Sequence, residues 1–317
     1  MFSSKKHLIV VASMLMSGFV QATPLSDFNL ILTGDYNYQG GEVEGRTLLG
    51  GNLNAAGHSP TFATRETTVP NKDTVTIVGD VNAGNINLNA GSLSYGGSYN
   101  LAWNVNLNGG GSSVQSVTAG NQVDMQAAFD DVETELRNDS AYFASLSSNA
   151  VLNGSQLLYS GADSVAVFDL DFSQVFAQNN SLSLDAGTAE TVVINVSGSD
   201  VTVGGGVNLT NGFGLQAGGI NIGAANILWN FYEADSIDFN NLATVGSVLA
   251  LDADITGGAV FDGSVAAKSY TGAREFHSFG FDWTPPQVPA VVSEGSTTIL
   301  FAFGLVFLAL SRRKTRI

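Results

Sequence analysis

Short runs of alternating polar and apolar residues, separated by Gly and Asn, recur through most of the chain and restrict its fold more than any other feature. Residues 85–89 read Asn-Ile-Asn-Leu-Asn, and residues 104–108 read Asn-Val-Asn-Leu-Asn. On a β-strand, alternation with period two places one set of side chains inward and the other outward. Similar runs recur between residues 28 and 121 and between 156 and 268, at irregular spacing. The pattern predicts a mainly β protein built from many very short strands.

Three features favour a single-stranded β-solenoid (β-helix) over other β architectures. The strands are short, and Gly-Asn corners are frequent, as the positive φ angles of tight corners require. Asn also recurs inside the runs, where stacked amide ladders would use it, with successive coils about 4.8 Å apart. A large β-sandwich or jelly roll is the alternative. Because the chain has no Cys, disulfides and thiolate metal sites are excluded.

Residues 122–147 break this pattern, because they contain almost no Gly or Pro and space their apolar residues as a helix does. The segment predicts a long lateral helical insert that covers one face of the solenoid. Asn138-Asp139-Ser140 would end one helix and cap a second. A structural role is the main interpretation of the segment, and a partner-binding helix is the minor one.

The charge of the chain excludes one class of partner. The formal net charge is −16, and residues 23–284 hold six basic against 27 acidic residues, a net charge of −21. Because a surface this acidic repels phosphate backbones, we expect no nucleic-acid partner.

Residues 1–22 have the three parts of a secretory signal peptide. Lys5 and Lys6 make a basic start, residues 8–20 are mostly apolar, and Val20-Gln21-Ala22 puts small or apolar residues before the predicted cleavage between Ala22 and Thr23. An uncleaved membrane anchor is the alternative. We therefore expect an exported protein.

The C-terminus predicts a sorting or anchoring signal. A Pro-containing linker and sorting motif (285–298) precedes an apolar transmembrane segment (299–311), and a basic tail (312–317) with Arg312 and Arg313 would remain cytoplasmic. This arrangement resembles the PEP-CTERM signal, of whose hexad the chain keeps Val292, Glu294, Ser296 and Thr297 but replaces both prolines. The resemblance implies an exosortase-like processing enzyme as a partner and at least transient contact with the inner membrane. A plain membrane anchor is the alternative.

The region between these ends, residues 23–284, resembles the choice-of-anchor A domain, an adhesive module of secreted bacterial proteins. The matching motifs include Phe28-Asn29-Leu30, Gly34-Asp35, Gly50-Gly51-Asn52, Leu228-Trp229-Asn230-Phe231, Asp252-Ala253-Asp254 and Glu275-Phe276-His277. The resemblance covers about residues 27–281 and implies adhesion. The chain also resembles, more weakly, the bacterial ice-binding protein fold, a discontinuous β-solenoid flanked by a long helix. No Thr-X-Thr array repeats here, so only the fold is taken from that likeness.

Two pairs of aspartates are the candidates for a chemical site. Asp169 and Asp171, like Asp252 and Asp254, would project from one side of a strand. Each pair would offer oxygen ligands to Ca²⁺ or carboxylates for sugar cleavage. Ordinary exposed strand residues would show the same spacing. Apart from Ca²⁺, we expect no cofactor.

Two further groups of polar residues predict structural clusters. Glu42, Glu44 and Arg46 would share one side of a strand near the start of the fold and form an ion pair. Arg274, Glu275 and His277 would close the last coil.

Together these features predict a non-enzymatic adhesin of the cell surface, cell envelope or biofilm matrix that binds a polysaccharide, matrix or surface ligand through polar outer faces. A polysaccharide lyase or hydrolase on a β-solenoid is one alternative. A passive envelope or biofilm component is the other.

Overall fold

The computed structural model of the protein describes residues 22–70 and 72–283. Most of the leader, the linker and sorting motif, the transmembrane segment and the basic tail lie outside the described residues. No helix within 22–70 and 72–283 is long and apolar enough to span a membrane.

The N-terminal half forms four coils, each with one strand on each of three faces of a solenoid-like stack. A short helix, α1 (Pro24–Asp27), precedes them. The strands of the four coils, in order, are β1 (Leu30–Leu32), β2 (Tyr36–Gly40) and β3 (Glu42–Val43); β4 (Thr47–Leu49), β5 (Leu53–Ala55) and β6 (Thr61–Phe62); β7 (Asp73–Ile77), β8 (Val81–Ala83) and β9 (Ile86–Leu88); β10 (Ser92–Tyr95), β11 (Tyr99–Leu101) and β12 (Val105–Leu107). The 3₁₀-helix η1 (Gly111–Ser113) and β13 (Val117–Ala119) follow, and β13 pairs with β10.

The C-terminal half begins with an antiparallel hairpin, β14 (Val151–Asn153) and β15 (Gln156–Leu158), and continues as five coils. Their elements are β16 (Val165–Asp171), α3 (Phe172–Val175) and β17 (Ser181–Asp185); β18 (Thr191–Ser197), β19 (Asp200–Thr202) and β20 (Asn208–Leu209); η2 (Ala224–Asn226), β21 (Ile227–Asn230), β22 (Ser236–Asp238) and β23 (Thr244–Val245); β24 (Ser247–Thr256) and β25 (Val260–Asp262); β26 (Val265–Ala273) and β27 (Glu275–His277). The strands of successive coils pair in parallel, which identifies a curled parallel sheet and excludes the sandwich.

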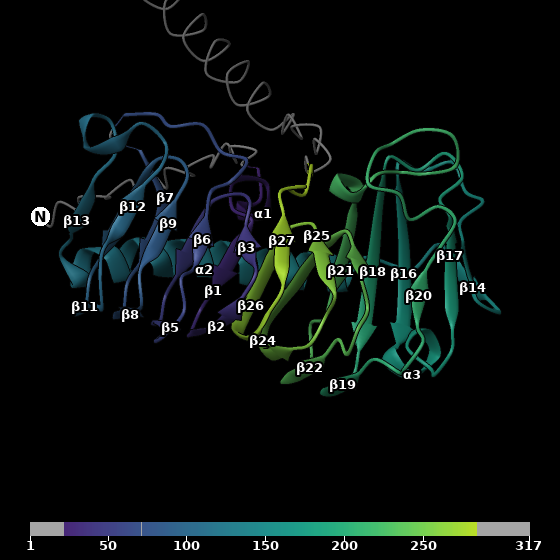
Figure 1. Ribbon diagram of the computed structural model, residues 1–317. Coiled ribbons are helices and arrows are strands. Elements are labelled where there is room, and N and C mark those ends of the chain that lie inside the picture. The colour runs from purple at the N-terminus through teal and green to yellow at the C-terminus, as the bar shows by residue number, and fades with distance from the viewer. Residues whose placement is uncertain (1–21, 71, 284–317) are drawn as a thin grey trace, which may run out of the picture. The chain divides into compact units, whose positions relative to one another are not determined.

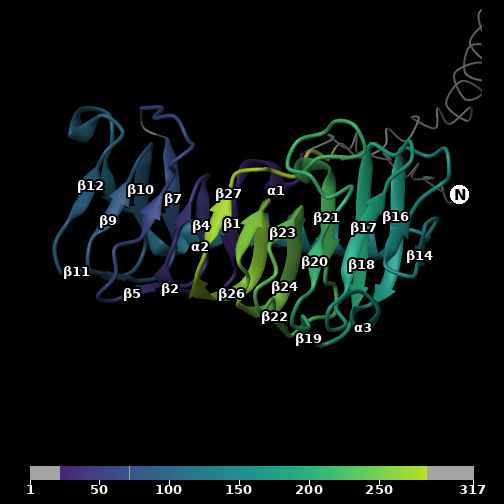
Figure 2. The same cartoon turned by 45° about the vertical axis from the view of Figure 1, so that its right-hand side comes forward.

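The two halves meet in the middle of the stack, where the first coil of the chain lies against the last (Figures 1 and 2). The long strand β26 pairs with β1 and, beyond a bend, with β2, and β27 pairs with β3. The stack therefore runs outward from β1 to β13 and returns from the opposite end with β16. The solenoid is discontinuous, and its sequence termini are neighbours.

Helix α2 (Gln122–Ser145) connects the two halves, because it carries the chain along the back of the stack from one end towards the other (Figure 1). Its 24 residues span about 36 Å, or about seven coils at a spacing of about 4.8 Å. The predicted break at residues 138–140 is wrong, because α2 is one continuous helix. Phe129, Leu136 and Phe143, spaced seven apart, are buried along one stripe against the first face of the stack.

A polar contact explains why Ser140 does not cap a second helix. Its Oγ donates to Oδ1 of Asn230 on β21 at 2.8 Å, and Nδ2 of Asn230 donates back to the Ser140 carbonyl at 3.0 Å. Asn195 on β18 donates to the carbonyl of Phe143 at 2.8 Å. These buried amides fix α2 against the sheet, so the sequence Asn138-Asp139-Ser140 serves tertiary packing rather than a turn.

Candidate functional site: the coil junction and the uncharged coils

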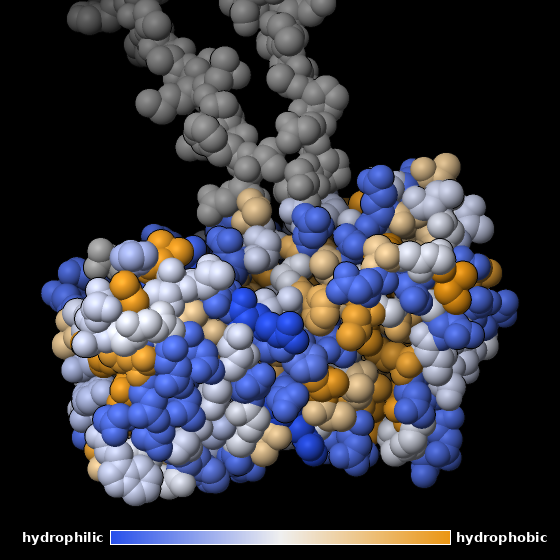
Figure 3. Space-filling view, turned by 45° about the horizontal axis from the view of Figure 1, so that its top comes forward, coloured by the Kyte–Doolittle hydropathy of each residue, from blue (hydrophilic) through white to orange (hydrophobic). Residues whose placement is uncertain are grey.

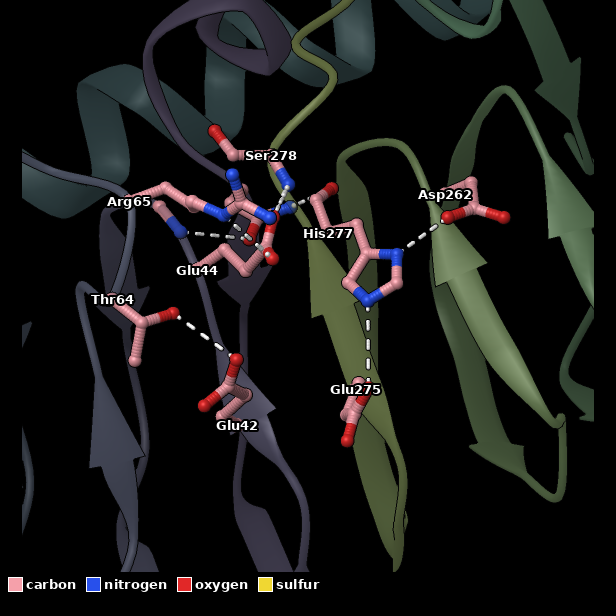
Figure 4. A network of polar contacts seen from close by, with 10 residues as sticks. Glu42, Glu44, Thr64, Arg65, Asp262, Glu275, His277 and Ser278 are labelled. Atoms are coloured by element: carbon pink, nitrogen blue, oxygen red, sulfur yellow. Dashed lines mark hydrogen bonds and ion pairs between the residues drawn. The ribbon is translucent and has the colours of Figure 1, made fainter. Parts of the chain in front are cut away.

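The first and last coils of the chain are tied together by polar side chains where β3 lies beside β27 (Figure 4). Glu44, which directly follows β3, is 8% exposed, and its Oε2 accepts a hydrogen bond from the Ser278 amide at 3.0 Å. Its Oε1 accepts from Nε of Arg65 at 3.2 Å. Because Arg65 follows β6, one carboxylate connects the first, second and last coils.

His277 continues this network towards the C-terminal coils. Its Nδ1 lies 2.6 Å from Oδ1 of Asp262 on the adjacent strand β25, and its Nε2 lies 3.4 Å from Oε2 of Glu275 (Figure 4). Partial burial lowers the pKa of His277, but the hydrogen bond and charge of Asp262, helped by Glu44 and Glu275, outweigh burial and raise the pKa above its ordinary value. The imidazolium is thus favoured within a ring of carboxylates.

Asn29 is the most deeply buried polar residue of the junction, with 3% of its surface exposed. Its Nδ2 donates to the carbonyls of Gly263 and His277 at 3.2 and 2.9 Å, and its Oδ1 accepts from the Gly45 amide at 3.0 Å. One amide side chain therefore satisfies three backbone groups on segments that are far apart in sequence.

The structure places the predicted polar residues differently from the expectation. Residues 42–44 and 275–277 were expected at separate ends of the fold, but they lie on neighbouring strands because the chain closes on itself. The ion pair expected within residues 42–46 does not form. Glu44 pairs with Arg65, whereas the guanidinium of Arg46 lies 4.3 Å from the centre of the Phe28 ring. Residues 44–46 form a corner between β3 and β4, so strand alternation does not hold there.

Two residues of these clusters take no direct part in the junction contacts. The carboxylate of Glu42 accepts a hydrogen bond from the Thr64 hydroxyl at 3.2 Å, at the margin of the junction (Figure 4). Arg274 occupies the corner between β26 and β27, next to Glu275 in sequence, and so does not share the side of the strand that carries Glu275 and His277.

The paired aspartates do not converge. Asp252 and Asp254 lie on β24, where each carboxylate already has a cationic partner: Arg137 of α2 lies 3.1 Å from Asp252, and Lys268 lies 2.8 Å from Asp254. Burial raises the pKa of Asp254, but hydrogen bonds from Lys268 and Ser269 lower it overall.

The second pair lies on β16, which is separated from β24 by β18 and β21. Asp171 caps α3 by accepting a hydrogen bond from the Ser173 amide at 2.9 Å, in a capping box with Gln174. Asp169 is exposed on the same strand. Within residues 22–70 and 72–283, no group of three or more His, Asp or Glu side chains is arranged to hold a metal ion. These contacts give Asp171, Asp252 and Asp254 structural partners.

Asn side chains form a row on the second face of the N-terminal coils. Asn37, Asn54, Asn82 and Asn100 occupy the same register on β2, β5, β8 and β11. Nδ2 of Asn54 donates to Oδ1 of Asn37 at 3.0 Å, and Nδ2 of Asn100 donates to Oδ1 of Asn82 at 2.9 Å. We call this row the first amide ladder.

A second amide ladder lies on the third face of the same coils. Asn106 donates to Asn87 at 2.8 Å, Asn87 donates to the Thr61 hydroxyl at 3.2 Å, and Asn108 donates to Asn89 at 3.0 Å. Asn100 and Asn106 each donate one hydrogen within their ladder and retain a second N–H, whereas Asn54 donates to both Asn37 and Asp35. The ladders thus present hydrogen-bonding groups outward at the coil spacing of about 4.8 Å.

The outer coils of the N-terminal half carry no side chain that is charged at neutral pH. Between Asp80 and Asp124 the sequence contains no Asp, Glu, Lys, Arg or His, although the protein is strongly acidic overall. We call residues 81–121 the uncharged coils. At the corner between β11 and β12, where the two ladders adjoin, the Trp103 side chain is 75% exposed. At the other end of β11, Tyr95 and Tyr99 stack with ring centres 4.7 Å apart.

Trp103 and the uncharged coils were not identified from the sequence, although the absence of charged residues between Asp80 and Asp124 is visible in it. Figure 3 shows hydrophilic and hydrophobic residues mixed over the face that it presents, so hydropathy alone does not mark these coils. Asp262, Arg65 and Asn29 were also missed as junction residues. Their partners lie on other coils, so no local pattern identifies them.

A cleft of about 480 Å³ lies on the C-terminal half, beside β17 and the loop that contains Ile220. Among its described lining residues, Asp185 alone carries an ionisable side chain. Sugar cleavage by paired carboxylates needs two such groups across the bond. The cleft could therefore hold a ligand, but its described lining residues do not include the two carboxylates that such cleavage requires.

A comparison with protein families decides the relationship of the chain. Residues 21–278 match the model of an ice-binding-like adhesive domain. The chain belongs to this family. Searches of curated proteins and of solved structures returned no match.

This adhesive domain accounts for nearly all of the described residues, in agreement with the resemblance to the choice-of-anchor A domain. The family indicates an adhesin-like protein of the cell surface. The match ends at residue 278, so the PEP-CTERM-like tail lies outside it.

Proposed function

We propose that the protein is an exported, non-enzymatic adhesin whose uncharged coils bind a neutral polysaccharide. The observation that carries the proposal is the position of exposed Trp103 between two amide ladders on a part of the surface without charge. Aromatic rings stack on the apolar faces of sugar rings, and amides exchange hydrogen bonds with hydroxyl groups. The net charge of −21 in residues 23–284 disfavours polyanionic ligands.

The amide ladders suit a repeating ligand. Each coil repeats the same donor and acceptor groups at about 4.8 Å, so an extended glycan would meet equivalent groups along its length. Single contacts with exposed amides are weak, and affinity would come from several of them acting together with Trp103.

Binding of the full mature chain to an array of neutral and acidic polysaccharides tests the proposal, with and without a chelator to expose any need for Ca²⁺. We expect Trp103→Ala to weaken binding at least about tenfold, equivalent to about 1.4 kcal/mol. Ile220→Ala is the matched control, because Ile220 is 70% exposed on the other half of the molecule. Binding that survives Trp103→Ala but not Ile220→Ala would move the site to the cleft, and no binding at all would favour a passive envelope component.

Export and anchoring rest on the two ends of the sequence. The leader would be removed after Ala22, and residues 292–317 would hold the protein at the inner membrane until a sorting enzyme processes the tail. Deletion of residues 292–317 should release the protein into the medium. A truncated protein that stays bound to cells would contradict both the sorting and the anchor interpretations.

A further inference from the structure

Thr23, the residue that would follow the predicted cleavage site, is fixed in the folded domain. It is 1% exposed, and it directly precedes α1, which packs against α2. Its carbonyl accepts hydrogen bonds from the amide and hydroxyl of Ser26, at 2.9 and 2.8 Å. Leu25, two residues later, is fully buried in the core beneath α2. The start of the mature chain therefore has a defined place.

Carboxylates of α1 and α2 gather at this place. The Thr23 hydroxyl hydrogen-bonds to Asp139, while the second carboxylate oxygen of Asp139, Oδ2, is inaccessible to solvent and has no hydrogen-bond partner in the described structure. Burial raises the pKa of Asp139. Burial also raises the pKa of Glu135, as do the charges of Asp139 and Asp27. Asp139 as a whole is only partly buried, but a carboxylate oxygen that is shielded from solvent without a donor is costly, so Oδ2 points to a positive group beside it.

We infer that the α-ammonium group of Thr23, formed when the leader is removed, binds Asp139. The inference rests on the processing proposed above. Hydrolysis by a leader peptidase adds the hydroxide of one water to the Ala22 carbonyl carbon and a proton to the Thr23 nitrogen. That amine takes up a second proton from solvent at neutral pH. The backbone nitrogen is three bonds from the Oγ1 atom that already contacts Asp139, so the new ammonium group lies within reach of Oδ2.

The contact would make folding of the domain sensitive to processing. Before cleavage, the Thr23 nitrogen is an uncharged amide with one hydrogen. After cleavage, it carries a positive charge and three donors, which satisfy the buried oxygen and offset the repulsion among Asp27, Glu135 and Asp139. The mature chain is therefore more stable than the precursor, and its N-terminus is held against α2.

N-terminal sequencing of the exported protein tests the cleavage step alone. A first residue of Thr23 is expected, and any other residue would overturn the inference. The docking step is tested on the full mature chain that begins at Thr23, with a free or an acetylated amine. Acetylation should lower the unfolding temperature by about 2–4 °C, the shift typical of about one lost ion pair in a domain of this size.

Variants identify the carboxylate that is responsible. The effect of acetylation should vanish in Asp139→Asn and persist in Asp131→Asn, since Asp131 is exposed on α2. An equal effect of acetylation in wild type and Asp139→Asn would refute docking on this residue. A measurement on wild type alone provides a second readout: the pKa of the Thr23 amine, followed by NMR, should exceed the usual range of about 7.7–8.0. A value within that range would contradict the contact even if Asp139→Asn does not fold.

Discussion

Replacement of Asn29 by Ala tests whether the closure of the first coil on the last stabilises the whole domain. Asn29 is 3% exposed and lies where three segments of the chain meet. The substitution leaves the backbone hydrogen bonds of the coil in place and removes only the side-chain amide. The carbonyls of Gly263 and His277 lose a donor, and the amide of Gly45 loses its acceptor.

The expected cost follows from these three contacts. Each net hydrogen bond contributes about 1 kcal/mol, and a buried group left without a partner adds to the loss, so we expect the free energy of unfolding to fall by about 3–5 kcal/mol. Water that entered the site would reduce the loss towards the lower value.

Guanidinium denaturation of wild type and Asn29→Ala, followed by circular dichroism, measures this difference. The midpoint should fall while the slope of the transition is unchanged, because the same surface is exposed on unfolding. Asn100→Ala is the matched control: its amide lies on an exposed ladder, and we expect a change within about 0.5 kcal/mol. A loss below about 1 kcal/mol in Asn29→Ala would refute the reasoning, as would an equal loss in both variants.

Three further substitutions test other parts of the fold. The pKa of His277 is raised above its ordinary value of 6.5, so its stabilising effect is fully present below about pH 6.5 and disappears as the pH rises through the folded-state pKa. The difference in unfolding temperature between wild type and His277→Gln should therefore decrease with rising pH. A difference that stays constant with pH would contradict this. Phe143→Ala removes a buried ring that packs 5.2 Å from the Trp283 ring, and should lower the free energy of unfolding by about 3–5 kcal/mol in thermal or chemical denaturation, whereas Val123→Ala on the exposed start of α2 should change it little. Gly41 has φ +87°, and a Cβ added there would lie 2.1 Å from the Arg274 carbonyl oxygen. Gly41→Ala should therefore reduce the yield of folded protein and lower its unfolding temperature by several degrees. An unchanged unfolding temperature would show that the junction is not tightly packed at Gly41.

The repeating strands of the fold could be predicted from the sequence because the patterns that specify them extend over only a few residues. Alternation in segments such as residues 85–89 identifies a strand with one buried face, and Gly and Asn mark its corners. The helix between residues 122 and 147 was also readable from its spacing. The break within it was predicted wrongly, because Ser140 and Asn138 have the same local preferences whether they cap a helix or face a sheet.

The candidate binding surface was less accessible to sequence reasoning. The Asn residues of the ladders stood out, but their alignment depends on which coil follows which. No local sequence pattern distinguished Trp103 from a buried aromatic residue, and only the structure shows that it lies at an exposed corner. The aspartate pairs satisfied a spacing rule on single strands. Only the structure shows that Asp252 and Asp254 pair with Arg137 and Lys268 of other elements, and that Asp171 caps α3.

The sequence by itself determined that this protein is a strongly acidic chain of short strands with one long helix, because period, composition and charge act over a few residues at a time. The tertiary structure alone decided that the first coil closes on the last. That contact joins residues more than 200 positions apart, and its hydrogen bonds exist only after α2 has carried the chain back along the stack.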